Sequence, residues 1–589
     1  MKYKNLAEIF ITKAQRFNEK TLIRYQKRPN DELTSISWAE SYDKVESISL
    51  GLAKLGAKAK DNIGLLAITY HKWLFCDLAI LSLGASTVPL YHNCSEETIL
   101  YIIEHAELEY VFVRNKIQLQ KIRAHFDKLE KLKYVIVLED RGDIPKNQPK
   151  IITLDDIIRI GDHEKKNQAD LFKERIKAIQ EEDIATIIYT SGTTGIPKGV
   201  PLTHKNCLSA ALSIYEYVPL HDKHNTLSFL PLAHVFERIC GQFYGLDQGV
   251  TFTYCDKAES IPKFLKHENI TMMLVVPRIL EKMHNQITLE IDKQAELVQD
   301  TIYKALDFGV NYHKKKLRKE KITFLEHLAY TAAKATILNK IKNKLSPSLE
   351  FFVTGGAPLD PEILYFFMAI GIDIHEGYGL TETTAPLTVN PRLASKPGTV
   401  GIPFGHFDLK IAQDNEILCK GPSLFSGYYK DEAASKEAII DGWFHTGDLG
   451  EFDEEGYLKI IGRKKDLLIT AGGKNIAPIK IEQKLCQSHF ISQAVVVGDR
   501  ERYLAALLTL DKIAVEEWVH ERKEDSDVYE HINKEVQQIN ASLNNYETIK
   551  KFAILDQELS IEAGELTPTL KIKRNVVNEK YAETIQGLF

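Results

Sequence analysis

Short apolar segments alternate with helical segments along the first part of the chain, and this alternation restricts the fold more than any other feature. Apolar residues at helical spacing indicate helices at 39–55, 74–83, 96–105 and 121–131. Short runs of β-branched and aromatic residues indicate strands at 62–68, 110–113 and 134–138, which lie between these helices or after the last of them. Strands that alternate with helices form βαβ units, in which helices cover both faces of a parallel sheet. We therefore predict an α/β fold with a large N-terminal domain of parallel sheets.

The pattern of residues changes at two places in the later part of the chain. Past residue 391 the segments are short and broken by glycine, as at 398–405, which predicts a small antiparallel β region. Residues 462–466 then form a charged connector, and strands are expected beyond it at 493–497 and 503–508. At 589 residues the chain is long enough for more than one domain. We predict a large domain over 1–464 and a small α+β domain over 465–589.

Charge and cysteine usage exclude several classes of protein. The formal net charge of -6 argues against nucleic acid as a general partner. The seven cysteines are scattered, without a Cys-x-x-Cys pair, which favours reduced thiols in a cytoplasmic protein. The longest apolar segment, 73–90, is interrupted by Asp77, Gly84 and Pro89. We expect a buried helix leading into a strand there instead of a membrane span. Peripheral contact with the inner face of a membrane stays open, as does the oligomeric state, for which a homodimer is one possibility.

A charged, mostly helical insert is expected over 291–345, and it contains the basic run 313–319. Such a run can contact anionic lipid or the phosphates of a nucleotide. A run of charged residues is more often the solvent-exposed face of a helix, and this is the interpretation that we favour from the sequence.

A glycine- and hydroxyl-rich loop follows the strand predicted at 184–189. Glycine lets the backbone turn sharply and approach a ligand, so that N–H groups can surround phosphate oxygens. Hydroxyl groups add donors, and Lys198 adds a positive charge. A solvated glycine loop is the simpler alternative, and the spacing of a Walker A loop is absent. The candidate phosphate ligands are Thr190, Ser191, Gly192, Thr193, Thr194, Gly195 and Lys198.

The stretch 189–200 resembles the phosphate-binding signature of the adenylate-forming, or AMP-binding, enzymes, which join a carboxylate to AMP. Further segments resemble the other motifs of that family and occur in the family's order: 355–359, 376–384, 445–450, 469–476 and 566–574. Within the family, the segments 230–238 and 376–384, the helical insert and Pro-Thr-Leu-Lys at 568–571 are most similar to bacterial long-chain fatty acid–CoA ligases.

The resemblance implies a role for each motif. Tyr378 would stack on adenine, Thr381 would bind phosphate, and Glu382 would be an oxygen ligand for Mg²⁺. Asp448, assisted by Arg463, would hold the ribose. His234 would order the site beside the carboxylate of the acid. The remaining residues implied to bind ATP are Gly356, Ala357, Pro358, Glu376, Gly377 and Gly379.

The resemblance also implies that the C-terminal domain is a mobile lid. Lys571 would bridge the carboxylate and the α-phosphate, although Leu570 stands where the family usually has glycine. Gly472 and Gly473 would line the path of the pantetheine of coenzyme A after the lid rotates. Lys465 would be the hinge.

The implied reaction converts a long-chain fatty acid and ATP into acyl-AMP and pyrophosphate, and then transfers the acyl group to coenzyme A. Mg²⁺ is the implied cofactor; ATP, fatty acid and coenzyme A are the implied substrates. Two alternatives stay open. One is an adenylating enzyme that delivers its acyl group to a carrier protein or another thiol. The other is a catalytically silent protein of the same fold that binds lipid or nucleotide.

Overall fold

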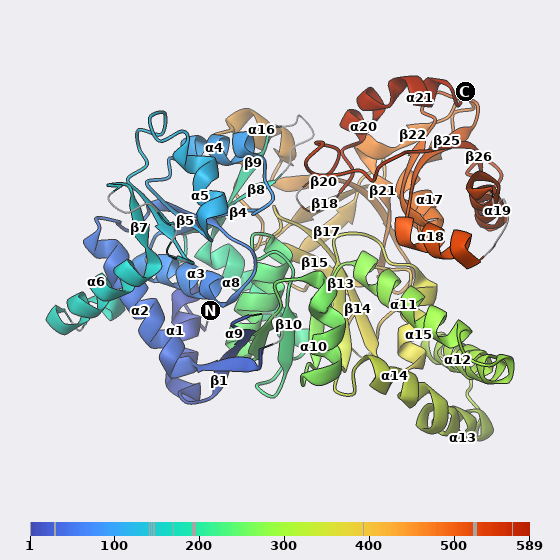
Figure 1. Ribbon diagram of the computed structural model, residues 1–589, viewed down its shortest axis with the longest axis horizontal. Helices are drawn as coiled ribbons and strands as arrows, with labels where there is room; N and C mark the ends of the chain where they lie inside the picture. The colour runs from blue at the N-terminus through green and yellow to red at the C-terminus, as the bar shows by residue number, and fades with distance from the viewer. Residues whose placement is uncertain are drawn as a thin grey trace.

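The computed structural model describes residues 2–589 except 29–30, 141, 143, 145–147, 169, 191–195, 393, 522–526, 568, 570 and the side chain of residue 521. It confirms the predicted α/β fold: two large, mostly parallel sheets are followed by a small antiparallel sheet and a C-terminal α+β part (Figure 1). The predicted division between residues 464 and 465 falls inside the short helix η5 (Lys464–Asp466). It stays a prediction.

The first large sheet has seven strands, all parallel except the last pair. In spatial order these are β7 (Ile151–Thr153), β6 (Tyr134–Val137), β5 (Tyr110–Val113), β3 (Asn62–Leu66), β4 (Ser86–Leu90), β8 (Ile184–Thr190) and β9 (Lys198–Thr203). The antiparallel pairing of β8 and β9 places Thr190 opposite Lys198. The predicted phosphate loop therefore connects two hydrogen-bonded strands, and its residues Ser191, Gly192, Thr193, Thr194 and Gly195 lie outside the described residues.

The second large sheet has nine strands, with a parallel centre and antiparallel edges. In spatial order these are β16 (Ile402–Pro403), β15 (Ala385–Val389), β14 (Asp373–Leu380), β13 (Phe351–Gly355), β12 (Met272–Val275), β10 (Asn225–Ser228), β11 (Thr251–Tyr254), β1 (Thr21–Gln26) and β2 (Leu33–Ser37). Ligands of open parallel sheets gather beyond the carboxyl ends of the strands.

The helices of the N-terminal half are α1 (Leu6–Phe17), α2 (Trp38–Lys54), α3 (His71–Leu83), α4 (Glu96–His105), α5 (Lys116–Arg123), α6 (Leu154–Asn167), α7 (Leu171–Ala178), α8 (His204–Ser213), η1 (Ile214–Glu216), the π-helix η2 (Phe236–Phe243) and α9 (Tyr244–Gln248). The segment 73–90 is a buried helix followed by a strand, as predicted. The helix predicted at 121–131 is wrong in its bounds. The Asn115 side chain caps the backbone N–H of Ile117, so that α5 begins earlier and ends at Arg123.

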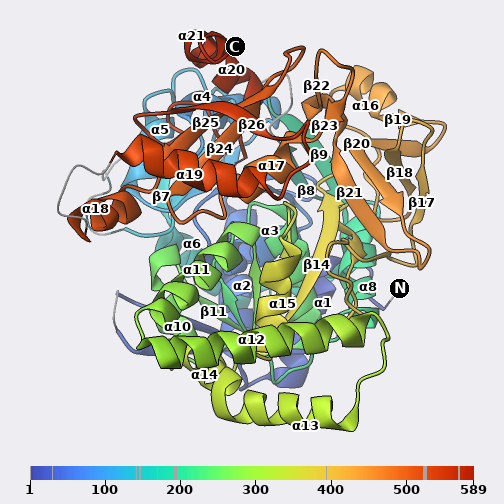
Figure 2. The ribbon, with the colours of Figure 1, turned by 90° about the vertical axis from the view of Figure 1, so that its right-hand side faces the viewer.

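The predicted helical insert is confirmed. The insert consists of α12 (Glu296–Leu317), α13 (Phe324–Ala333), the π-helix η4 (Lys334–Leu338) and α14 (Asn339–Leu345). The helices before it are η3 (Ala258–Ser260), α10 (Ile261–His267) and α11 (Pro277–Asp292), and the helix after it is α15 (Pro361–Ala369). Figure 2 shows α12 running across one side of the molecule, with α13 below it. No helix in the described ranges is both long and apolar enough to cross a membrane.

The last part of the chain contains the predicted small β region and the α+β part. The antiparallel sheet comprises β17 (Asp408–Ile411), β18 (Glu416–Lys420), β20 (Trp443–Phe452), β19 (Ile439–Ile440) and β21 (Leu458–Arg463), with α16 (Glu432–Ala438) beside it. Beyond η5 follow the hairpin β22 (Leu468–Ile469) and β23 (Asn475–Ile476) and the sheet of β24 (Ile491–Val497), β25 (Leu504–Leu510) and β26 (Ile549–Ile554). Its helices are α17 (Pro478–Leu485), α18 (Lys512–Glu521), α19 (Val528–Asn540), α20 (Arg574–Lys580) and α21 (Ala582–Gln586).

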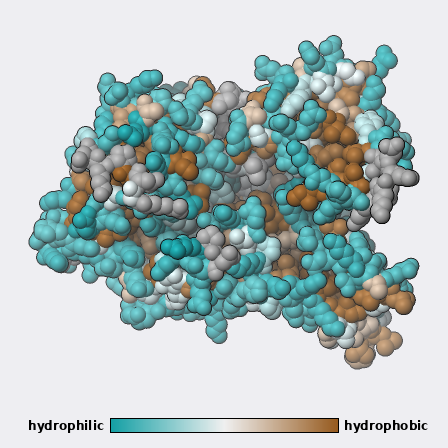
Figure 3. Space-filling view, viewed as in Figure 1, coloured by the Kyte–Doolittle hydropathy of each residue, from teal (hydrophilic) through white to brown (hydrophobic). Residues whose placement is uncertain are grey.

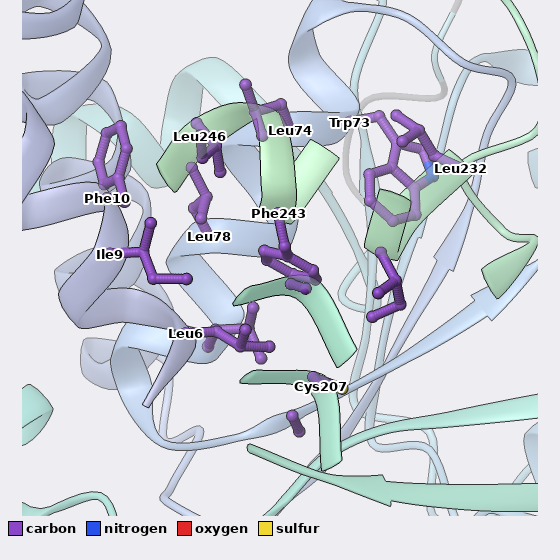
Figure 4. Close-up of a cluster of buried hydrophobic side chains, with 14 of the residues drawn as sticks. Leu6, Ile9, Phe10, Trp73, Leu74, Leu78, Cys207, Leu232, Phe243 and Leu246 are labelled. Carbon is purple, nitrogen blue, oxygen red and sulfur yellow. The ribbon is translucent and has the colours of Figure 1, made fainter. Parts of the chain in front are cut away.

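The main hydrophobic core joins the two large sheets through α3. All residues of α3 from Trp73 to Leu83 are buried, and a helix that is buried all around fits between two layers. Figure 4 shows Leu74 and Leu78 of this helix near Phe10 of α1 and Leu246 of α9. The same cluster includes apolar residues from strands of both sheets.

An ion pair lies inside this core. Arg238 of η2 forms two hydrogen bonds to Asp77 of α3, one of them from Nε to Oδ2 at 3.1 Å, and both side chains are almost completely buried. Gln242 donates to Asp77 Oδ2 at 2.8 Å, and the Thr87 hydroxyl donates to Asp77 Oδ1 at 2.7 Å. Arg238 also donates to Thr186 of β8. The pair therefore connects η2, which follows β10 of the second sheet, to α3, β4 and β8 of the first.

Replacing only one member of this pair should destabilise the protein. Arg238→Met leaves the Asp77 carboxylate buried without its cation, a change that typically costs about 3–5 kcal/mol. Differential scanning fluorimetry should show a clearly lower Tm. The double variant Asp77→Leu/Arg238→Met should recover much of the loss, because it removes both buried charges. Lys304→Ala breaks an exposed ion pair to Asp300 and serves as the matched control, with little change expected. An unchanged Tm for Arg238→Met would contradict the prediction.

Candidate functional site

A cavity of about 1030 Å³ lies where the carboxyl ends of strands from both large sheets meet the antiparallel sheet and the C-terminal part. Most of the residues proposed from the sequence line it: Thr190, Lys198, His234, Gly356, Ala357, Pro358, Gly377, Tyr378, Gly379, Thr381, Glu382, Asp448, Arg463, Lys465 and Lys571. Glu376, Gly472 and Gly473 are not among the lining residues. The cavity brings together segments separated by almost the whole length of the chain.

One wall is built around Asp448. This residue lies within β20, directly opposite Arg463 on β21, so that its carboxylate is held by the sheet and not by a turn. The Tyr378 hydroxyl donates a hydrogen bond to Asp448 Oδ2 at 2.8 Å, and Arg463 Nε lies 3.3 Å from Oδ1. Burial raises the pKa of Asp448, and the charge of Arg463 opposes that rise. The aromatic ring, the carboxylate and the guanidinium thus form one fixed group.

The loop after β13 forms a second wall. Gly356 has a φ of +85°, which favours glycine, and no atom would lie within 4 Å of an added Cβ. Glu376 lies beneath this loop and accepts a hydrogen bond from the backbone N–H of Leu359 at 3.1 Å. Burial raises the pKa of the Glu376 carboxyl to about 8. Glu376 therefore supports the loop from outside the cavity, whereas the sequence motif suggested direct contact with ATP.

The segment that follows β14 carries Thr381 and Glu382 into the cavity. Its backbone is closely packed, because a Cβ on Gly379 would lie 1.4 Å from the carbonyl oxygen of Ala385. Thr384 and Ala385 both have positive φ values, 58° and 76°, which are uncommon for residues other than glycine. The Thr384 hydroxyl donates to the carbonyl of Ser423, which helps to hold this conformation. Two neighbouring residues in a costly conformation indicate that the surrounding structure fixes the direction of Glu382.

Tyr428 is a residue of the site that the sequence did not reveal. Its hydroxyl donates a hydrogen bond to Glu382 Oε1 at 2.9 Å, and Lys198 Nζ lies 5.0 Å from the centre of its ring. Tyr428 thus contacts both the carboxylate and a cation of the phosphate loop. No motif marked it, because it lies in an irregular segment between β18 and α16.

Lys571 reaches the cavity from the C-terminal part. Two hydrogen bonds to Thr567 hold its backbone: its N–H donates to Thr567 Oγ1 at 3.0 Å, and its carbonyl accepts from the Thr567 N–H at 2.8 Å. Lys571 lines the cavity, and its side chain is accessible there. Burial and the nearby Arg463 lower the pKa of Lys571, while Asp448 and Glu382 oppose that change.

His234 faces this group in a neutral form. Burial, assisted by the charge of Lys571, lowers the pKa of His234 to about 4. The backbone N–H of Phe236 donates to His234 Nδ1 at 3.2 Å, so we assign the ring proton of the neutral form to Nε2. The imidazole can therefore donate a hydrogen bond from Nε2 to an oxygen atom without adding a charge.

In the C-terminal part, Lys571 faces the cavity, whereas the glycine motif at Gly472 and Gly473 does not. Arg278 Nη2 donates to the carbonyl of Ser492 at 2.9 Å, and Gln483 donates to the carbonyl of Pro358. Gly472 and Gly473 form the exposed turn of the β22–β23 hairpin, with Gly473 at a φ of +72°. The two sites implied for this part are thus in different surroundings.

The lining of the cavity includes a group of apolar residues, here called the apolar arm, on the second sheet and the elements beside it. Leu274 on β12 and Val353 on β13 are paired in register, and Met272 lies two residues before Leu274 on the same face. Further apolar residues in the lining include Ile214, Val218, Leu220, Cys240, Tyr244, Val389 and Phe404. The lining of the cavity thus combines charged residues with apolar residues.

Glu376→Gln tests the support of the Gly356 loop. The pKa of Glu376 is raised from 4.5 to about 8, so its contribution to stability is complete below pH 4.5 and is lost as the pH rises to about 8. Glutamine keeps an oxygen that can accept from Leu359 and cannot ionise. The variant should therefore gain unfolding free energy relative to wild type as the pH rises through this range. Tm profiles of the two proteins that stay parallel from pH 5 to pH 9 would contradict this.

Comparison with known proteins agrees with this arrangement. The model of the AMP-binding enzyme family matches residues 10–429, and that of the AMP-binding enzyme C-terminal domain matches residues 465–589. The long-chain-fatty-acid–CoA ligase FadD15 of Mycobacterium bovis is 33% identical over 583 residues, covering 96% of this chain and 94% of the relative. The human long-chain-fatty-acid–CoA ligase ACSBG2 is 32% identical and covers 94% of this chain and 88% of the relative.

Solved structures with the same fold include an anthranilate CoA ligase, AuaEII, in complex with anthranoyl-AMP. It has a TM-score of 0.74 and 18% identity, and covers 98% of this chain and 97% of its own. The o-succinylbenzoate CoA synthetase of Bacillus subtilis in complex with ATP and magnesium ion has a TM-score of 0.67 and 20% identity, and covers 97% and 99%. The family models and the similarity to FadD15 establish that the chain belongs to the AMP-binding enzyme family.

Proposed function

We propose that the protein is a long-chain fatty acid–CoA ligase, which forms acyl-AMP and pyrophosphate from a fatty acid and MgATP and then transfers the acyl group to coenzyme A. The observation that carries this proposal is the composition of the cavity of about 1030 Å³. Its lining holds the cations of Lys198, Arg463 and Lys571 together with the apolar arm on the second sheet. The names of the relatives FadD15 and ACSBG2 support the same activity.

The nucleotide would occupy the walls built around Asp448 and Gly356. A carboxylate can accept hydrogen bonds from both hydroxyls of a ribose, and Arg463 together with the Tyr378 hydroxyl keeps the Asp448 carboxylate in one orientation. The small residues Gly356 and Ala357 leave room for a flat ring beside the face of Tyr378. These assignments place the α-phosphate toward Thr381, Lys198 and Lys571.

In the first half-reaction a carboxylate oxygen attacks the α-phosphorus, and the bond to the pyrophosphate oxygen breaks. Negative charge is redistributed over the phosphate oxygens in the transition state, and nearby cations stabilise it. Lys571 and Lys198 are the cations that this chain supplies there, and His234 can donate a hydrogen bond to an oxygen of the acid. The resulting acyl-AMP has a better leaving group than the free acid.

Mg²⁺ fits this site as an ion that ATP brings with it. Glu382 is a cavity-lining carboxylate whose Oε1 accepts from Tyr428. Among the described residues, no three His, Cys, Asp or Glu side chains form a group that could hold a metal alone. Mg²⁺ usually takes one or two protein carboxylates, with phosphate oxygens and water as its other ligands. Glu382 would hold the ion, which supplies charge neutralisation on the phosphates.

The acyl chain would lie in the apolar arm. Each CH₂ group removed from water contributes ~0.8 kcal/mol, so a long chain gains much more binding free energy than acetate does. The neutral state of His234 suits this arrangement, because a buried cation in a cavity with so many apolar lining residues would be costly to desolvate.

The second half-reaction requires a rearrangement of the C-terminal part. A thiol attacks the acyl carbon, and AMP leaves with the bonding electron pair. Gly472 and Gly473 are exposed and away from the cavity in the present arrangement, which fits the adenylation state. Rotation near Lys465 would withdraw Lys571 and bring this hairpin to the thiol. The seven free cysteines favour a cytoplasmic protein.

A panel of carboxylic acids tests the activity. With MgATP and coenzyme A, long-chain fatty acids should give AMP and acyl-CoA, and acetate should be a poor substrate. Chelation of Mg²⁺ with EDTA should stop product formation, and added Mg²⁺ should restore it. A preference for acetate or an aromatic acid would contradict the proposed substrate. Acyl-AMP that accumulates without reacting with free coenzyme A would favour a carrier protein as acceptor. No acid-dependent pyrophosphate exchange would indicate a silent binding protein.

A pair of variants separates the two half-reactions. Lys571→Ala should slow adenylate formation about 10²–10³-fold, by analogy with the loss of one charge-stabilising donor. It should still convert supplied acyl-AMP and coenzyme A at nearly the normal rate. Gly472→Leu should do the opposite by obstructing the thiol path. Gly472 suits this test because its φ is not positive and the nearest atom to an added Cβ lies 3.9 Å away. Loss of the same half-reaction in both variants would contradict the two-state proposal.

A further inference from the structure

The helical insert presents apolar residues to solvent. Phe324, Leu325 and Leu328 of α13 are 77%, 75% and 55% exposed. The neighbouring exposed residues on the outer face are small and uncharged: Ala329, Thr331, Ala332, Ala335 and Thr336. At the helical period these positions fall on one side of α13 and its continuation η4. Figure 3 shows brown surface at the lower right, where Figure 1 places α13.

The inner side of α13 packs on the protein through Tyr330 and nearby polar side chains. Tyr330 is buried and stacks on Tyr312 of α12, with ring centres 4.1 Å apart. The Tyr312 hydroxyl is 2.8 Å from His327 Nδ1, and Glu326 pairs with Lys315. The helix therefore differs from an ordinary surface helix, whose outer side is polar, because its outer side carries large apolar residues as well. Because these contacts fix α13 on α12, the exposed apolar side is a stable feature of the molecule.

The helical insert that carries this apolar face is rich in positive charge. Residues 313–344 contain ten Lys and Arg and two Asp and Glu, a formal net charge of +8 in a chain whose total is -6. Five of these cations pair with acidic side chains: Lys314, Lys315, Arg318, Lys319 and Lys344. The other five have no ion pair to a residue that the structure describes: Lys316, Lys321, Lys334, Lys340 and Lys342. Of these, Lys316, Lys321 and Lys340 are exposed.

We propose that the outer face of α13 docks onto the surface of an anionic phospholipid bilayer, with Phe324, Leu325 and Leu328 inserted at the interface. A helix with Phe and Leu on one side and Lys beside it is suited to lie in the plane of a membrane surface. Unpaired lysines attract anionic headgroups, which a neutral protein partner would not require. The proposal goes beyond the proposed reaction and does not depend on which acid the enzyme activates.

Sedimentation with lipid vesicles tests the proposal. The full-length protein should bind vesicles of phosphatidylcholine with phosphatidylglycerol, bind phosphatidylcholine vesicles weakly, and be released by salt. The triple variant Phe324→Gln/Leu325→Gln/Leu328→Gln keeps good helix formers and should lower the partition constant roughly a hundredfold or more. Lys316→Gln/Lys321→Gln/Lys340→Gln should weaken binding roughly fivefold per charge removed.

Matched controls separate the surface from general hydrophobicity and charge. Ile117→Gln/Ile513→Gln/Val519→Gln replaces exposed apolar residues on other helices and should bind vesicles as wild type does. Lys128→Gln/Lys166→Gln/Lys177→Gln removes three exposed charges elsewhere and should have a smaller effect than its counterpart in the insert.

Three results would overturn the proposal: no binding of the wild-type protein to anionic vesicles, undiminished binding of the α13 variant, or equal losses in the control variants. Analytical ultracentrifugation identifies the alternative occupant. If the wild-type protein is a dimer and the α13 variant is a monomer with unchanged vesicle binding, the face is an interface between two copies of the chain.

Discussion

The buried pair of Asp77 and Arg238 determines how the two large sheets meet. Asp77 lies on α3, a helix that is buried on all sides. Arg238 lies on the π-helix η2, which begins two residues after His234. Because isolated charges cannot remain in such a core, the two elements are fixed to one another with little freedom. The carboxyl ends of the two sheets then face one cavity. The geometry of the reacting groups thus depends on an interaction that contacts neither substrate.

The site itself is a balance of opposite charges from distant parts of the chain. Arg463 and Lys571 stand near Asp448 and Glu382, and each carboxylate offsets the repulsion between the two cations. Lys571 belongs to the C-terminal part. Movement of that part away from the cavity would therefore leave fewer positive charges around the phosphates. The position of one part of the molecule therefore changes the affinity of the other for anionic groups.

The sequence predicted the fold well, because βαβ alternation and glycine-rich motifs are local signals. It also predicted which residues gather at the cavity, since Tyr378, Asp448 and Lys571 belong to recognisable motifs. The sequence could not show that Glu376 supports a loop from below while its neighbours line the cavity, because all of these residues belong to the same motif. Tyr428 and the outward apolar face of α13 escaped prediction for another reason: both depend on tertiary packing that has no local pattern.

The charge of the helical insert has a consequence for the molecule as a whole. With +8 on residues 313–344 and a total of -6, the remaining chain carries a formal net charge of -14. The formal charge is therefore unevenly distributed along the chain, with an excess of cations on the insert and an excess of anions elsewhere. Near a surface with negative potential, one end is attracted while the body is repelled, and the resulting torque turns the molecule before any contact forms. Salt shortens the distance over which this alignment acts, since the Debye length is about 8 Å at physiological ionic strength.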